Sequence, residues 1–190
     1  MLQLFVKMQR VMQYKVNLPD ERSKIDVTIS KILQFGLAEV QAVMFVRSKE
    51  TAELLHKKLV DCKIDVAMVH GDLVPEARNE LITLFYEYAF QILITTEVAF
   101  LADGINESTL LVVNFDLPVQ GDSFDEPDYD VFTQQSSLKA VKGAVFNLMC
   151  GNTEKMLMEK IERCLKLKVD EVPFWKSDIQ FLAAFEKAGF

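Results

Sequence analysis

The chain has 190 residues, of which 50% are hydrophobic and 26% are charged, a composition that fits one globular domain with a sizeable core. It contains no apolar run of 18 residues and no secretory signal pattern at its start, so neither a membrane span nor secretion is expected. The net charge of −7 argues against nucleic-acid binding by bulk electrostatic attraction, although a local basic face stays open.

In chain order, short apolar runs alternate with longer amphipathic stretches, which is typical of strands that alternate with helices. The expected elements are a strand at 11–16, a helix from Pro19 and Asp20 to about residue 35, a strand at 41–46, a helix capped by Ser48, a strand at 66–69, a helix at 76–86, strands at 91–95 and 110–115, a helix from Tyr129, a strand at 145–149 interrupted only by Asn147, a helix from a Thr153 cap to about residue 167, and a last helix with Phe181, Leu182 and Phe185.

This β-α-β-α order predicts an α/β fold with a mostly parallel sheet covered by helices on both faces. Ligands of such sheets bind beyond the carboxyl ends of the strands. The acidic segment at 118–127 is the expected surface excursion.

Polar residues follow four of the expected strands. They are Arg47 with Ser48, Gly71 with Asp72, Thr95 with Thr96, and Asp116. Glycine permits close approach of a ligand, and threonine offers a hydroxyl and a backbone N–H to phosphate oxygens. Arg78, one turn into the following helix, could add a cation. Taken singly, each residue could equally be a cap or turn residue.

The sequence gives little support for a phosphate-binding loop, a zinc site or a functional histidine. The sequence has neither a GxxxxGK[ST] nor a GxGxxG loop. The cysteines Cys62, Cys150 and Cys164 are widely spaced, so a zinc site is not expected and a reducing compartment is the simpler interpretation. His56 is expected on a helix surface or half-buried, and His70 in a turn.

Five segments in this order carry a family resemblance: VMQYKV, QAVMFVRSKETAELL, VAMVHGDLVPEARNELITLF, QILITTEVAFLADGIN and LLVVNFDLP. Over about residues 11–168 the chain resembles the second, C-terminal RecA-like lobe of a DEAD-box RNA helicase. The long segment NFDLPVQGDSFDEPDYDVF is most similar to the mRNA-export branch of that family. The resemblance implies a RecA-like three-layer αβα sandwich over residues 1–168, with residues 169–190 as a helical extension packed on it.

The resemblance also implies cofactor and RNA contacts. Two lobes close around single-stranded RNA and around ATP with Mg²⁺, but the phosphate loop belongs to a first, N-terminal RecA-like lobe, so the isolated domain would hold no cofactor. The positions that match RNA-backbone contacts are Arg47, Gly71, Asp72, Arg78, Thr95 and Thr96.

Two later motifs depart from the family pattern. An Arg-Gly-(Leu or Ile)-Asp run becomes Asp103 to Asn106, which leaves Gly104 and Asn106 as the nucleotide-binding positions. The arginine-finger motif falls on residues 131–138, where Phe132, Gln135 and Leu138 replace its three arginines; the family's arginines at the positions of Gln135 and Leu138 reach the γ-phosphate.

A third departure is Pro75, which stands where the family has Gln, three residues before Arg78.

Because the arginine-finger positions have lost their charge, no catalytic residue is assigned in this chain. Residues 131–138 could also be simply a helix with Val131, Phe132 and Leu138 partly inward.

Three interpretations stay open. The chain is the second lobe of an ATP-dependent helicase, or a pseudo-helicase lobe that serves as a binding module, or an unrelated Rossmann-like domain, which the absent glycine motif disfavours. The lobe alone is expected to be an inactive monomer that binds RNA weakly.

Export-type relatives imply nuclear-pore factors with inositol hexakisphosphate as partners, and a cytoplasmic or nuclear-pore location. The basic residues near the C-terminus could form such a face, or a solvated helix side paired with Glu154, Glu159 and Glu162. The tail is expected to close on the body through Phe174 and Trp175. The basic residues are Lys155, Lys160, Arg163, Lys166 and Lys168.

Overall fold

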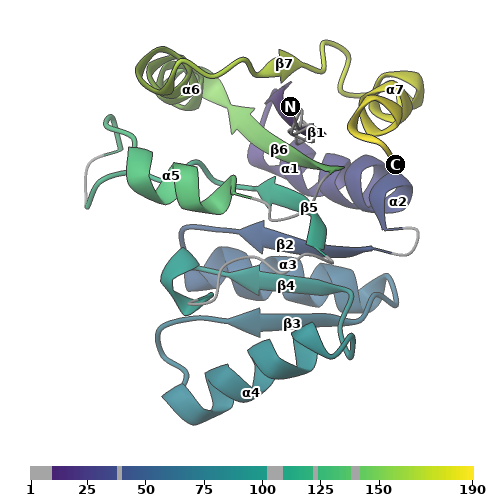
Figure 1. Ribbon diagram of the computed structural model, residues 1–190, viewed down its shortest axis with the longest axis vertical. Helices are drawn as coiled ribbons and strands as arrows, with labels where there is room; N and C mark the ends of the chain where they lie inside the picture. Colours follow the sequence, from purple (N-terminus) through teal and green to yellow (C-terminus); the bar gives the residue numbers. More distant parts are fainter. Residues whose placement is uncertain (1–9, 38–39, 102–108, 122–123, 138–141) are drawn as a thin grey trace, which may run out of the picture.

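The computed structural model describes residues 10–37, 40–101, 109–121, 124–137 and 142–190. Its centre is a seven-stranded sheet in the order β3-β4-β2-β5-β6-β1-β7, in which every neighbouring pair is parallel (Figure 1). The strands are β1 (Arg10–Leu18), β2 (Gln41–Phe45), β3 (Val66–Val69), β4 (Ile92–Thr95), β5 (Thr109–Asn114), β6 (Lys142–Cys150) and β7 (Asp170–Glu171).

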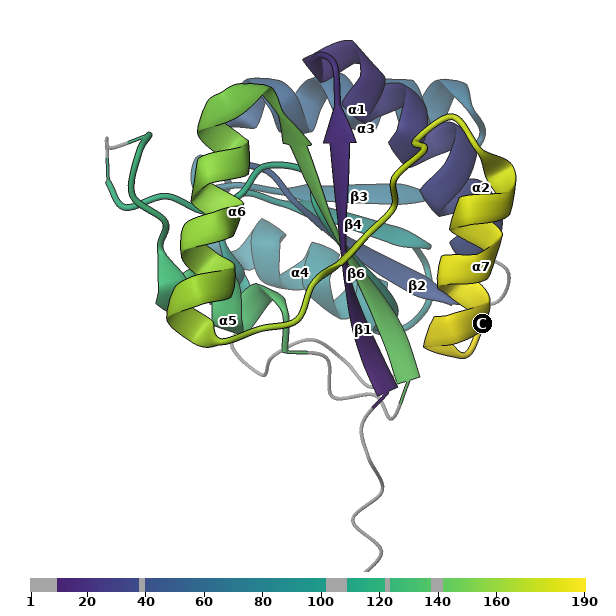
Figure 2. The same ribbon diagram turned by 90° about the horizontal axis from the view of Figure 1, so that it is seen from above.

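Helices connect these strands. They are α1 (Glu21–Val27), η1 (Thr28–Leu33), α2 (Gln34–Gly36), α3 (Lys49–Asp61), α4 (Pro75–Tyr86), η2 (Val98–Phe100), α5 (Tyr129–Gln135), α6 (Gly151–Leu165) and α7 (Asp178–Ala188). The predicted fold class, a parallel α/β sheet between helical layers, is confirmed. The sheet twists strongly, so that β1 and β3 point in different directions when the molecule is seen from above (Figure 2).

Strand residues alternate between two cores because successive side chains of a strand face opposite sides of the sheet. Ala42, Met44 and Val46 join the cluster that packs under α1, η1, α3 and α7. Val43 and Phe45 join the cluster on the opposite face, under α4. A third cluster joins α5 and α6 over the ends of β5 and β6; its members are Leu117, Phe132, Met149, Leu157, Met158, Ile161 and Val169.

Caps set the helix starts at two of three predicted places. The side chain of Asp20 accepts from the Ser23 N–H and begins α1, and the side chain of Ser48 accepts from the Thr51 N–H and begins α3. The Thr153 prediction is wrong. The N-cap of helix α6 is Cys150, three residues before Thr153, and the Cys150 N–H donates to the Glu154 carboxylate at 2.7 Å, which satisfies the backbone at this earlier start.

Helix α7 packs against the body of the domain. Phe181 and Phe185 are buried beside Phe146, and the Tyr14 hydroxyl of β1 donates to the Ala184 carbonyl at 2.8 Å. The prediction for Phe174 is wrong: its side chain is 66% exposed, whereas Trp175 packs against the core.

A buried amide pair fixes the register of the central strands. Asn114 of β5 donates to Asn147 Oδ1 of β6 at 2.7 Å, and Asn147 donates to the Tyr14 carbonyl of β1 at 2.9 Å. Both amides are fully buried. Within the described part of the chain, no helix has the length and apolar character needed to cross a membrane.

Candidate functional site

The sheet order brings the polar strand-end residues to one edge. Strands β3, β4, β2 and β5 are neighbours in this order, so the residues that follow them meet at their carboxyl ends. Backbone hydrogen bonds connect the ends of these strands. The Val46 N–H donates to the Thr95 carbonyl at 3.1 Å, and the Thr96 N–H donates to the Val69 carbonyl at 3.3 Å. Arg47, Gly71, Asp72, Thr95, Thr96 and Asp116 therefore lie on the edge at which parallel sheets bind ligands.

A buried charge cluster lies under the β2–β5 part of this edge. The Lys24 ammonium of α1, whose side chain is 0% exposed, lies 2.8 Å from Glu154 Oε2, 3.2 Å from Glu21 Oε1 and 3.6 Å from Asp116 Oδ1. Burial opposes the charged form of Lys24, but the carboxylates of Glu154 and Asp116 outweigh it and hold the pKa of Lys24 above its ordinary value. Burial raises the pKa of the Glu154 carboxyl, against the attraction of Lys24.

Arg47 belongs to the same cluster. Its guanidinium lies 3.3 Å from Glu154 Oε1 and 3.9 Å from Asp116 Oδ1, and its backbone N–H donates to Asp116 Oδ2 at 2.9 Å. The guanidinium also lies 5.7 Å from the ring centroid of Phe124. Arg47 is thus at the predicted edge, but two carboxylates already hold its charge.

The loop after β3 is more open. A Cβ added at Gly71 would meet one atom within 4 Å, the Glu97 Oε1 at 3.4 Å, so the backbone here is accessible to a ligand. The Asp72 carboxylate accepts from Lys49 at 2.7 Å, and this hydrogen bond lowers the pKa of Asp72. Arg78 stacks on Phe100 with its guanidinium 4.3 Å from the ring centroid.

The two threonines differ. Thr95 is fully buried, and its hydroxyl donates to the Glu97 carbonyl at 3.0 Å and accepts from the Glu97 N–H at 3.3 Å. The turn after β4 thus uses the Thr95 hydroxyl that was expected to face a ligand. Thr96 is half-buried and faces the cavity described next.

A cavity of about 810 Å³ opens at the carboxyl ends of β2 and β5. Residues of α1, α3, η2 and α5 and the loop after β5 line it. We name it the carboxyl-edge cavity; the lining residues used below are Glu21, Arg47, Leu54, Thr96, Glu97, Val98, Asp116, Val119, Phe124, Asp128 and Gln135.

The arginine-finger segment forms helix α5 for most of its length. Asp128 caps the helix, Phe132 is 0% exposed in the third core cluster, and Gln135 is 5% exposed. Among the described residues, Gln135 Oε1 has no hydrogen-bond partner. The inward position of Phe132 agrees with the helix interpretation. The predicted positions Leu138, Gly104 and Asn106 lie outside the described residues.

Glu21, Cys150 and Glu154 have ligand atoms within 4.8 Å of one another, a spacing that could hold a metal ion. The Lys24 ammonium already lies against both carboxylates. Burial and a hydrogen bond to Glu21 raise the pKa of the Cys150 thiol to about 12, so a thiolate ligand is disfavoured. The two carboxylates of this trio bind the Lys24 ammonium, and the Cys150 thiol donates to Glu21.

Sequence reasoning missed Lys24, Glu154 and Phe124. The predicted pairing of Glu154 and Glu162 with basic neighbours on one solvated helix side is wrong. Glu154 turns inward to Lys24, and Glu162 binds Lys15 of β1 at 2.7 Å. A signal existed for Glu154, which stands three, four and seven residues before the buried Leu157, Met158 and Ile161 and therefore on their face of the helix.

The helicase conserved C-terminal domain family matches residues 24–137. DEAD-box ATP-dependent RNA helicase 38 of Oryza sativa subsp. japonica is 37% identical over 196 residues, which cover 98% of this chain and 38% of the relative. The chain therefore spans less than two fifths of that protein.

Two solved structures share the fold. S. cerevisiae Dbp5 bound to RNA and ADP BeF3 matches with a TM-score of 0.81 at 24% identity, over 95% of this chain and 46% of Dbp5. The C-terminal domain of a Dbp5 variant bound to a Gle1 variant and IP6 matches with a TM-score of 0.80 at 24% identity, over 94% of this chain and 98% of that domain.

Proposed function

Because the chain belongs to the helicase conserved C-terminal domain family, in its DEAD-box RNA helicase form, we propose that it is the second lobe of an RNA-remodelling protein of the mRNA-export type. In this proposal the lobe contacts RNA backbone and docks on a first lobe, but it supports ATP hydrolysis poorly. The surviving role is binding.

The burial of Gln135 carries the proposal. An arginine finger must project from this lobe to a phosphate held by the other lobe, and it typically accelerates hydrolysis by about 10³–10⁵-fold. Gln135 has no charge and is only 5% exposed, so this glutamine does not reach toward a phosphate as an arginine finger would. Phe132, another former arginine position, is fully buried among apolar side chains.

The β3–β4 part of the edge supports RNA contact. The Gly71 backbone is open, Thr96 follows β4 at the same edge, and the half-buried Arg78 stacks on Phe100. Phosphate contacts through backbone N–H groups and one arginine are weak and independent of base sequence. We infer weak binding of single-stranded RNA by this lobe alone, with ATP and Mg²⁺ held only when a first lobe is present.

Partners at the nuclear pore form a further part of the proposal. The Dbp5 C-terminal domain is known in a complex with Gle1 and IP6. On this chain, Lys155, Arg163 and Lys166 are exposed on or next to α6, whereas Lys160 is bound to Glu126 at 2.8 Å. The three exposed cations could meet an anionic ligand such as inositol hexakisphosphate.

RNA-stimulated ATP hydrolysis by the longest natural chain that contains this lobe tests the proposal. The natural protein should show little turnover, and the double variant Gln135→Arg and Leu138→Arg should gain it. Gln134→Arg is the control for added charge, because Gln134 is an exposed neighbour and receives one of the two added positive charges outside the cavity. Ordinary turnover in the natural protein would overturn the proposal.

A further inference from the structure

The carboxyl-edge cavity is acidic, and RNA contact does not account for that. The described lining residues include four acids, Glu21, Glu97, Asp116 and Asp128, and one base, Arg47. Arg47 pairs with Asp116 and with Glu154 below the cavity, and the buried Lys24 pairs with Glu21, Asp116 and Glu154. Glu97 and Asp128 have no ion pair among the described residues. A polyanion would therefore meet net negative charge here, which opposes entry of an RNA phosphate.

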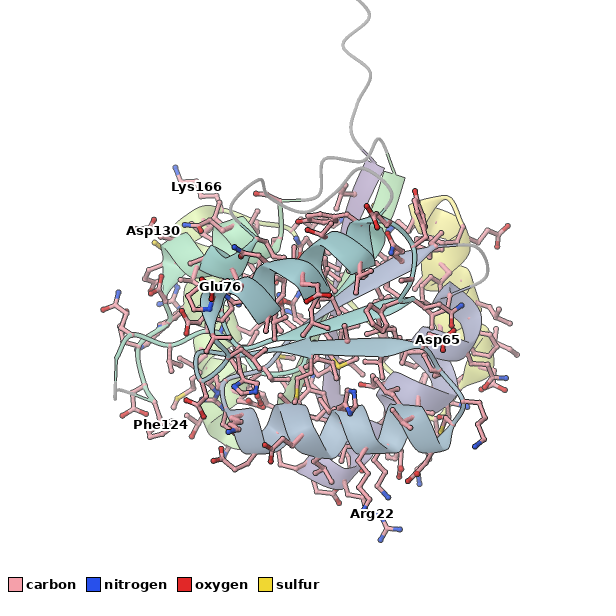
Figure 3. The ribbon with its side chains drawn as sticks, turned by 90° about the horizontal axis from the view of Figure 1, so that it is seen from below. Arg22, Asp65, Glu76, Phe124, Asp130 and Lys166 are labelled. Atoms are coloured by element: carbon pink, nitrogen blue, oxygen red, sulfur yellow. The ribbon has the colours of Figure 1, made fainter. Side chains whose placement is uncertain are left out.

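Acidic residues continue outside the cavity. Asp125 and Glu126 lie on the loop that precedes α5, and Asp130 lies in its first turn. Figure 3 shows Asp130 and Phe124 on the same side of the molecule, opposite Asp65, which precedes β3. Lys160 neutralises Glu126, but Asp130 has no ion pair among the described residues. Asp130 thus adds negative charge to the surface beside α5, which favours the approach of cations.

The rim of the cavity is apolar. Phe124 is 65% exposed and projects from its loop (Figure 3), and Leu54 of α3 is 46% exposed. Val98 and Val119 continue this apolar lining. Large exposed apolar side chains around a concavity are typical of a protein-binding site. The Phe124 ring lies beside the Arg47 guanidinium and is suited to a second cation on its open face.

An unpartnered polar atom lies at the wall. Gln135 borders the cavity, is 95% buried, and its Oε1 accepts no hydrogen bond. Buried carbonyl oxygens are seldom left unpaired in a finished site. A lysine or arginine head is a donor that could satisfy this oxygen after a small rotation of the amide.

We propose that the carboxyl-edge cavity binds a segment of a partner protein that carries lysine or arginine next to an apolar anchor. The cation would lie between Glu97 and Asp128, and the anchor would pack on Phe124 and Leu54. The site shares the edge with Gly71 and Thr96, so a bound segment would compete with RNA for this lobe. The inference does not depend on whether the lobe supports ATP hydrolysis.

Fluorescence anisotropy with this chain tests the proposal. The probe is a labelled eight-residue peptide with two arginines flanking a phenylalanine in a glycine frame. We expect saturable binding that weakens as salt rises, and no binding of the same peptide with glutamates in place of the arginines. Phe124→Ala and Glu97→Gln should each weaken binding about tenfold, the size of effect typical of a central interface residue.

Two matched control variants distinguish binding at this site from nonspecific binding of the peptide to the protein surface. Phe174→Ala removes an equally exposed phenylalanine, and Glu186→Gln removes an exposed acid on α7; both should leave the affinity within about twofold. The proposal is overturned if the arginine peptide fails to bind at about 1 mM, or if the controls weaken it as much as the cavity variants. It is also overturned if Phe124→Ala weakens binding of a labelled oligouridylate instead, because that result would make the cavity an RNA-base subsite.

Discussion

Replacement of Lys24 by methionine tests whether the buried charge cluster holds the edge together. The variant keeps an unbranched side chain that is one atom shorter, and it removes the ammonium that lies 2.8 Å from Glu154 and 3.6 Å from Asp116. Loss of one partner of a buried ion pair costs about 3–5 kcal/mol, because the other charge stays buried without compensation. Here Arg47 at 3.3 Å and the Cys150 N–H at 2.7 Å still bind Glu154, so we expect about 3 kcal/mol.

Urea-induced unfolding followed by circular dichroism measures this loss. The double variant Lys24→Met and Glu154→Leu should recover part of it, since apolar replacement of a buried pair is often neutral, while Asp116 keeps the Arg47 N–H at 2.9 Å. Lys57→Met, an exposed substitution on α3, serves as the control and should change the free energy of unfolding by less than about 0.5 kcal/mol. The reasoning is refuted if Lys24→Met is as stable as the natural chain, or if the double variant is no more stable than the single one.

Three further predictions concern stability. Gln135→Met should raise the free energy of unfolding by about 1 kcal/mol in thermal scans, because it removes the unpartnered buried oxygen; a fall would mean that the oxygen has a partner in solution. Tyr14→Phe should make stability less dependent on pH between 10 and about 12: burial and the nearby charge of Asp170 raise the pKa of Tyr14 to about 12, so the natural chain loses stability as pH rises through this window, and equal slopes in urea titrations would contradict this. Asn147→Leu should cost about 2–4 kcal/mol in urea unfolding, since the Asn114 amide and the Tyr14 carbonyl lose their partner; a cost below about 0.5 kcal/mol would show that the amide pair is dispensable.

The sheet could be predicted from the sequence because a parallel sheet buries both of its faces. Strands such as 41–46 are therefore continuous apolar runs, which differ plainly from the amphipathic helices between them. The order of the strands was enough to predict where the polar strand-end residues lie. The hydrogen-bond partners of these residues could not be predicted, because nothing in the sequence shows that Thr95 uses its hydroxyl for its own turn or that Asp116 already binds Arg47.

The main errors in predicting the site from the sequence concern charged residues that lie on the apolar face of a helix. Lys24 stands three and four residues before the buried Val27 and Thr28, and Glu154 stands before Leu157 in the same manner. Each residue taken alone looks like a solvated charge at a helix start. Only the fold, which places α1 beside the start of α6, shows that the two charges compensate each other.

The former arginine positions of α5 are not equivalent, and this decides how activity could be restored. Phe132 packs among Met149, Leu157 and Ile161 in the third core cluster, so an arginine there would bury a guanidinium with no described acid beside it and would threaten the fold. Gln135 borders the cavity, where an arginine could extend toward Asp128 and solvent. The core thus keeps Phe132 in place, whereas position 135 stays free to change. A gain of turnover in Gln135→Arg with Leu138→Arg at unchanged stability would support this distinction, and unfolding of that variant would show that position 135 has also become part of the core.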